Sequence, residues 1–221
     1  MKQIETDRLY LSSEPYIMVD EDINKWQTHL YYQDYLYRSI SGKIPFPIYE
    51  EELKRLNNYI VYLLEKTNEE TEEQINAHAN MEPDWIGVGT AEIEMTQELV
   101  KSTWSFNRNN TLYLTAVTLL NSFLESCLKD LVKRFISEEK IHSKGMSNVE
   151  KYVFLLNEFL KSEISIPEYL KKSRKLRNEF VHNHLSSFEV GEEVVRYTID
   201  AIADLFYVIE QEFSNKGILD S

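Results

Sequence analysis

Apolar side chains recur every three or four residues over several long stretches of this sequence, which is the spacing of a helix that buries one face. The clearest stretch is 111–136, where charged residues appear only from Glu125 onward. A helix this apolar over its first half is expected to lie at the centre of a helical bundle. The sequence shows no sustained strand-like alternation over several segments, so the pattern predicts an all-α protein.

Six further segments have the helical spacing, and turn-forming or capping residues separate them. Gly42, Pro45 and Pro47 end the first of these segments. Ser147 and Glu150 are placed as a capping box at the start of another. The predicted segments are 20–40, 49–77, 91–104, 149–161, 166–185 and 192–213.

The stretch 82–90 is the clearest candidate for a linker, because it places Pro83, Gly87 and Gly89 close together. The charge balance also differs between the two halves of the chain. Residues 1–100 contain 8 Lys and Arg against 20 Asp and Glu, whereas residues 101–221 contain 16 against 17. We therefore predict an acidic N-terminal helical region over residues 1–90, followed by an antiparallel helical bundle over residues 91–221.

The composition is typical of a globular protein, with 43% hydrophobic and 28% charged residues. The N-terminus lacks a basic start followed by an apolar segment, and the longest uncharged run, 109–124, is too short to span a bilayer. We therefore expect a cytoplasmic protein that does not cross a membrane.

The net charge of −13 argues against strong non-specific binding to long nucleic-acid duplexes. The single cysteine, Cys127, lies in an apolar run and is expected to be a buried structural thiol.

Residues 171–184 form the most basic stretch of this acidic chain, and the candidate catalytic residues lie within it. Arg177, Asn178 and His182 have the form Arg–polar–x–x–x–His and fall in the predicted penultimate helix. A histidine titrates near neutral pH, and a guanidinium can hold a phosphate through two parallel hydrogen bonds. These residue types suit RNA cleavage through the 2′-hydroxyl, which needs proton transfer and fixed positive charge at the phosphate.

Motif and helical context together resemble the HEPN superfamily, the nucleotide-binding and ribonuclease domains common in bacterial toxins and phage defence. The signature of that family is Arg-x(4–6)-His, usually with Asn, Asp or His directly after the arginine. The helix predicted over 111–136 also resembles the family's first core helix, in which Glu125 would match an acidic residue. The resemblance covers about residues 105–213 and implies an all-α, HEPN-like bundle with additional N-terminal helices.

The resemblance further implies a metal-independent endoribonuclease that needs no cofactor and acts as a homodimer, with the motifs of two protomers brought together. His182 would be the base or the acid, Arg177 would clamp the phosphate, and Asn178 would orient the histidine or the phosphate. The RNA product would carry a 2′,3′-cyclic phosphate. Such an enzyme would act as a toxin or phage-defence effector, held in check by an antitoxin or another regulatory protein. The cations expected to guide the RNA backbone are Lys171, Lys172, Arg174 and Lys175.

Two alternatives remain open on the sequence. On an ideal helix His182 lies about 140° from Arg177, whereas His184 lies within about 20° of it, so His184 is the alternative catalytic histidine. Arg177 could also bind Glu125 inside the bundle, which would favour a non-catalytic HEPN-like scaffold or antitoxin-like binding protein. A metal site at His182 and His184 is not expected, because no further ligands complete a tetrahedral set.

Overall fold

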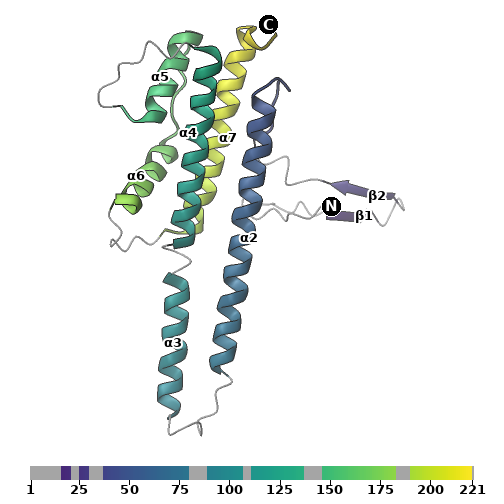
Figure 1. Cartoon of the computed structure of the whole chain (residues 1–221). Helices are drawn as coiled ribbons and strands as arrows, with labels where there is room; N and C mark the ends of the chain where they lie inside the picture. The colour runs from purple at the N-terminus through teal and green to yellow at the C-terminus, as the bar shows by residue number, and fades with distance from the viewer. Residues whose placement is uncertain are drawn as a thin grey trace.

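The computed structural model describes residues 16–20, 25–29, 37–79, 89–106, 111–136, 146–182 and 190–220. Figure 1 shows the arrangement of its elements. The helices are α2 (Phe46–Ala79), α3 (Thr90–Phe106), α4 (Tyr113–Phe135), α5 (Asn148–Leu160), α6 (Glu168–His182), α7 (Glu192–Asn215) and the short 3₁₀ helix η3 (Ile218–Asp220).

From residue 37 onward, the described residues form helices joined by turns and contain no strand, so the predicted all-α class is confirmed for this part of the chain. Its six α-helices correspond one for one to the segments predicted from residue 49 onward, and their ends agree to within a few residues. The capping box is also confirmed: the Ser147 hydroxyl accepts a hydrogen bond from the Glu150 amide, and the Glu150 carboxylate accepts one from the Ser147 amide. Within the described residues, no helix is long and apolar enough to cross a bilayer.

The helix predicted over residues 20–40 is wrong in the part of that range that the structure describes. β1 (Tyr16–Asp20) pairs antiparallel with β2 (Lys25–His29), and residues 37–43 are not helical. The later residues are held by hydrogen bonds to Glu210 of α7, which lies at least 169 residues further along the chain. Helical spacing cannot reveal such distant partners, and here they outweigh it.

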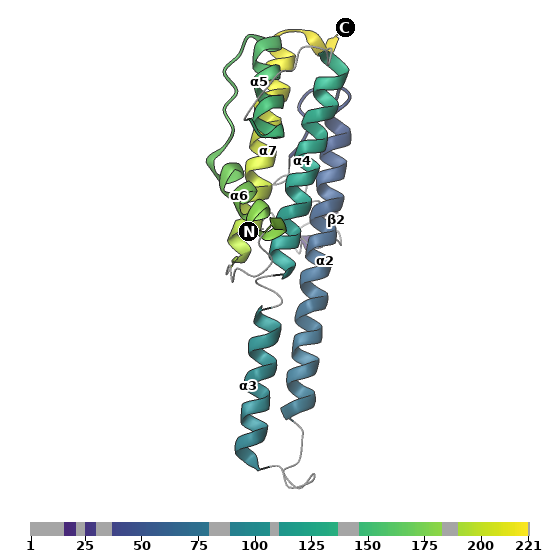
Figure 2. The same cartoon turned by 60° about the vertical axis from the view of Figure 1, so that its left-hand side comes forward.

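α4 and α7 form the centre of the helical core. They run beside each other in Figures 1 and 2, and α4 also contacts α2, α5 and α6. The segment predicted over 111–136 thus contacts four other helices, while the predicted bundle arrangement stays a prediction. One core cluster joins these helices and includes Leu53 and Ile60 of α2. Residues on both sides of residue 90 thus contribute to it, and the division into two regions near that point stays a prediction. Fully buried core side chains of α4 and α7 include Leu120, Leu124, Leu128, Ile199, Phe206 and Phe213.

A buried polar contact joins α6 to α4. The Asn121 side-chain amide donates to the Ser173 hydroxyl at 3.2 Å and to the Val117 carbonyl at 2.8 Å, and both Asn121 and Ser173 are buried. Buried polar groups are costly unless they are paired, so this contact restricts how α6 can lie on α4. The contact thus helps to position the helix that carries the Arg177 motif on α4.

A second buried polar cluster joins the segment before α2 to α7. The carboxylate of Glu210 is fully buried and accepts hydrogen bonds from Tyr37, from Ser39 Oγ at 2.6 Å, and from the amide and hydroxyl of Ser41. Burial alone would raise the pKa of Glu210, but the donors from Ser39, Ser41 and Tyr37 hold that pKa below its usual value. Burial and the bond to Glu210 raise the pKa of Tyr37. The cluster keeps an ionised carboxylate inside the core.

The second half of α2 and the whole of α3 form an arm that extends beyond the other helices. Figure 1 shows the second half of α2 continuing past the lower end of α4, with α3 packed beside it. Figure 2 shows the same arrangement from a direction 60° away. α3 has no buried residue. The arm therefore contributes little to the core, and the outer surface of α3 is open to solvent.

Candidate functional site

Arg177 lies on the face of α6 that packs against the core. Ser173, Arg177 and Phe180 are spaced by four and three residues and share that face; Ser173 is buried and the other two are half-buried. Arg177 Nη1 donates a hydrogen bond to the Asn178 side-chain oxygen at 3.3 Å, and Asn178 is exposed. Arg177 Nε is buried and has no hydrogen-bond partner within the described residues. Nε is therefore an unpaired donor on the buried side of the guanidinium, while Nη1 bonds to Asn178.

The two candidate histidines follow Arg177 at the end of α6. His182 is the last residue of α6, so the backbone is helical at both positions. Position 182 therefore lies about 140° round the helix axis from position 177. The side chain of His182 lies outside the described part of the structure, and so does the whole of His184. His182 and His184 therefore remain alternatives for the catalytic histidine.

Arg174 is half-buried beside two carboxylates from neighbouring helices. Burial and the positive charge of Arg177 lower the pKa of Arg174, while Glu150 of α5 and Glu125 of α4 act in the opposite direction. The pKa of Glu150 is lowered, mainly by hydrogen bonds from Ser147 and further by the charge of Arg174. The middle of α4, the start of α5 and the middle of α6 thus form one charged cluster.

Glu125 belongs to this cluster through a hydrogen bond from Asn148 at the start of α5. Arg177 bonds instead to Asn178, its neighbour in the chain. The supporting role expected for Glu125 stays a prediction, and so does direct pairing between Glu125 and Arg177. Glu125 and Arg174 are electrostatic neighbours, which sequence spacing did not indicate.

The lysines of α6 extend into solvent and make weak contacts within the helix. Lys171 lies 3.5 Å from Glu168, and Lys175 lies 3.9 Å from Glu179. Exposed ion pairs of this kind contribute about 0–1 kcal/mol, so both ammonium groups can exchange these partners for others. Lys172 lies over the ring of Tyr169, 5.3 Å from its centroid. α6 therefore presents a basic outer surface.

A pair of exposed tyrosines adjoins this surface, and sequence reasoning did not find it. Tyr169 of α6 and Tyr197 of α7 are stacked, with ring centroids 4.7 Å apart and an interplanar angle of 28°. Both rings remain partly open to solvent, at 47% and 44% exposure. They come from positions 28 residues apart on different helices, so no local motif could have indicated the pair. We refer to Tyr169, Lys172, Lys175 and Tyr197 as the aromatic–basic patch.

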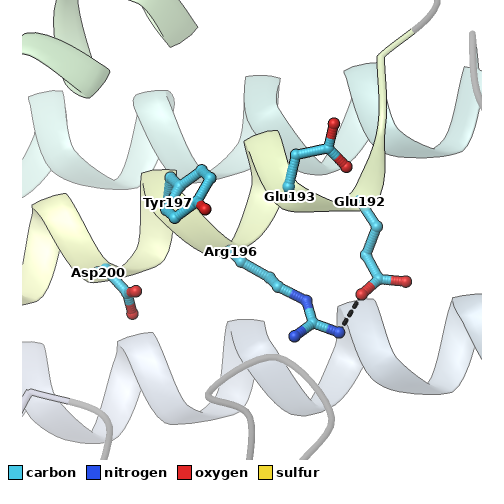
Figure 3. Close-up of a pocket in the computed structure, with 5 residues that line it drawn as sticks. All are labelled: Glu192, Glu193, Arg196, Tyr197 and Asp200. Atoms are coloured by element: carbon cyan, nitrogen blue, oxygen red, sulfur yellow. Dashed lines mark hydrogen bonds and ion pairs between the residues drawn. The ribbon is translucent and has the colours of Figure 1, made fainter.

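A pocket of about 430 Å³ opens at the start of α7 next to Tyr197, as Figure 3 shows. Arg196 is ion-paired with Glu192 in it. Burial raises the pKa of Glu192, and the negative charge of Glu193 adds to that shift. With three carboxylates against one guanidinium, the pocket favours cations over phosphates. Its lining consists of Glu192, Glu193, Arg196, Tyr197 and Asp200.

The predicted structural role of Cys127 is confirmed. Its thiol is buried, and burial, followed by the negative charges of Glu52 and Asp130, raises the pKa of Cys127. A thiol in this state is a poor nucleophile.

Cys127 lies beside a second pocket, of about 260 Å³, where Tyr49 donates to Asp130 at 2.7 Å and Arg134 pairs with the same carboxylate. Among the described residues, no three His, Cys, Asp or Glu side chains are placed to hold a metal ion.

No family model matches the chain, and comparisons with curated proteins and with solved structures found no match.

Proposed function

We propose that this protein is a metal-independent endoribonuclease of the HEPN type that cleaves RNA as a homodimer. The observation that carries the proposal is the content of α6. On one basic helix it has an arginine, an asparagine bonded to that arginine, and a histidine. The antiparallel bundle expected for residues 91–221 belongs to the same proposal. The proposed biological role of the protein is that of a toxin or phage-defence effector restrained by a regulatory protein.

The proposed reaction is a transesterification within the RNA. The 2′-oxygen attacks the adjacent phosphorus as its proton passes to a base, and the bond to the 5′-oxygen breaks as that oxygen takes a proton from an acid. His182 is suited to one of these proton transfers because its ordinary pKa is close to neutral. Arg177 stabilises the negative charge that builds on the phosphate, and Asn178 orients the guanidinium to which it is bonded. The products are a 2′,3′-cyclic phosphate and a 5′-hydroxyl.

The positions of Arg177 and His182 favour an active site made from two protomers. Arg177 is half-buried on the core side of α6, and position 182 lies about 140° further round the helix. A single protomer therefore does not present both residues on one face of α6. In a homodimer, His182 of one protomer can act beside Arg177 of the other.

The proposal is tested by incubating single-stranded RNA with purified protein in the presence of EDTA. We expect wild type to cleave, and we expect Arg177→Ala and His182→Ala to reduce the rate by at least about 100-fold, through lost charge stabilisation for the arginine and lost acid–base catalysis for the histidine. His142→Ala, a histidine outside the motif, is the matched control and should retain full activity. Loss of activity in His184→Ala, with His182→Ala still active, would move the catalytic role to His184.

A second candidate function is a non-catalytic HEPN-like scaffold or antitoxin-like binding protein. It is favoured by the half-buried position of Arg177, which packs on the core side of α6 rather than extending into solvent. The same experiment separates the two functions. If wild type and both motif variants fail to cleave RNA while all remain folded, the scaffold is favoured and the ribonuclease proposal fails.

A further inference from the structure

The outer surface of α3 carries apolar side chains that one protomer leaves uncovered. Met95, Leu99 and Phe106 are exposed by 76%, 64% and 55%. Spacings of four and seven residues place them in one row along the helix. We call this row the outer stripe. A 17-residue helix with no buried residue gains little from its own protomer, so covering the stripe would stabilise it.

The outer stripe faces away from α2. Ile93 and Trp104 are half-buried, which indicates the side of α3 that packs on α2. Met95 and Phe106 each follow one of these residues by two positions, which is about 200° round a helix. The stripe therefore lies on the opposite side of α3, where no part of the same arm can reach it.

An acidic row borders the outer stripe. Glu94 and Glu98 are four residues apart and therefore lie along one edge of α3, and both are exposed. Glu98 pairs only with Lys101 among the described contacts, an exposed pair that contributes little. The partner that covers the stripe must therefore combine apolar surface with positive charge.

The aromatic–basic patch has this combination. It offers two partly exposed tyrosine rings, with the ammonium group of Lys172 over one of them and the exposed Lys175 about one turn further along α6. In Figures 1 and 2, α3 and α6 lie on the same side of α2, with α3 beyond the end of the core toward which α6 runs. The two helices are thus at different levels of one side of the molecule, and the exposed side chains of the stripe and the patch can be reached by a second copy of the chain.

We propose that the outer stripe of one protomer docks on the aromatic–basic patch of a second copy, in a two-fold symmetric dimer. Because the contact is reciprocal, it forms twice in each dimer. Met95, Leu99 and Phe106 cover the tyrosines, while Glu94 and Glu98 pair with Lys172 and Lys175. Direct pairing of α3 with α3 would instead bring two acidic rows together and is disfavoured by their repulsion.

The two-fold axis of this dimer lies midway between the stripe and the patch of one protomer. In Figure 1, α6 runs toward the level of α3, so the end of the helix that carries the motif lies on the side of the region between stripe and patch. The docking does not depend on RNA cleavage. It does assign Lys172 and Lys175 to assembly rather than to the RNA backbone.

Charge exchange tests the docking, with sedimentation equilibrium of the full chain in the absence of RNA as the measurement. We expect wild type to dimerise. Glu94→Lys with Glu98→Lys, and separately Lys172→Glu with Lys175→Glu, should each weaken the dimer by at least tenfold in dissociation constant. Combining all four changes should restore the affinity to within about threefold of wild type, since the opposite charges face each other again. These fold-changes correspond to about 1.4 kcal/mol per factor of ten.

The matched control is Glu158→Lys with Glu163→Lys, which makes the same charge change at exposed positions outside the stripe. This control should dimerise like wild type. A monomeric wild type at micromolar concentration, equal dimerisation in all variants, or no recovery in the fourfold variant would overturn the docking. Weaker RNA binding by Lys172→Glu with Lys175→Glu, at unchanged dimer affinity, would overturn it in favour of RNA on the patch. A wild type that docks in this way but does not cleave RNA would refute only the ribonuclease.

Discussion

The buried carboxylate of Glu210 shows how single residues join distant parts of this chain. It receives hydrogen bonds from Tyr37, Ser39 and Ser41, which precede α2, although it lies near the end of α7. An ionised group in the core is tolerated when several donors replace its water. The donors here lower the pKa of Glu210 despite its burial. The ionised form therefore stabilises the folded protein.

Replacing Glu210 by glutamine should destabilise the protein by about 2 kcal/mol at pH 7, because the donors lose a charged acceptor and the new amide adds a donor of its own. The pKa of Glu210 is lowered in the folded state, so its contribution is complete above the ordinary glutamate pKa of about 4.3 and is lost as pH falls through the folded value. Denaturant unfolding of wild type and Glu210→Gln between pH 7 and pH 3 should show the difference shrinking in acid.

The exposed Glu158→Gln is the control for this measurement and should match wild type throughout. If the stability difference between wild type and Glu210→Gln were the same at pH 3 as at pH 7, the ionised carboxylate would not be the stabilising group.

At this scale, a local motif could be read from the sequence and long-range partners could not. Arg177 and Asn178 are adjacent, and their hydrogen bond joins neighbours. Asn121 and Ser173 are 52 residues apart, and their contact depends on how two helices pack. The Tyr169–Tyr197 pair is of the same kind. The sequence therefore did not indicate contacts such as these, because their partners are distant in the chain and follow no local pattern.

At the scale of elements, the helices from α2 to α7 were predictable because the spacing that defines a buried face is local. Capping residues sharpened the ends, as at Ser147. The segment 20–40 failed for a different reason. Its apolar spacing resembles that of a helix, but its later residues form hydrogen bonds to α7. Of its earlier residues, Asp20 ends β1 and residues 25–29 form β2, which pairs with β1. In this segment, contacts that form only in the folded chain determine the conformation, and the local apolar spacing does not.

The capping box of α5 gives a prediction at this scale. Ser147→Ala removes the side-chain acceptor for the Glu150 amide and should cost about 1 kcal/mol of unfolding free energy. It should also raise the pKa of Glu150, because the hydrogen bonds from Ser147 are the main cause of its lowered value. Denaturant unfolding and NMR titration of the Glu150 carboxyl measure the two effects. Ser214→Ala, at an exposed position near the end of α7, should change neither.

At the scale of the whole molecule, a compact helical core carries an acidic arm that leaves one apolar side open. The core explains how α6 is held, through buried contacts with α4 and α7. The arm leaves α3 open to solvent, since α3 buries none of its residues. In a dimer joined by the outer stripe and the aromatic–basic patch, the exposed side of α3 would be covered. The same dimer would bring together Arg177 and His182 from different subunits.

Analysis of the RNA ends produced by the purified protein in EDTA tests the central claim most directly. If Arg177 and His182 cleave RNA through its 2′-hydroxyl, wild type yields fragments ending in a 2′,3′-cyclic phosphate with a 5′-hydroxyl on the other fragment, and His182→Ala yields neither. Fragments with a 3′-hydroxyl and a 5′-phosphate, or identical fragments from wild type and His182→Ala, would contradict the account.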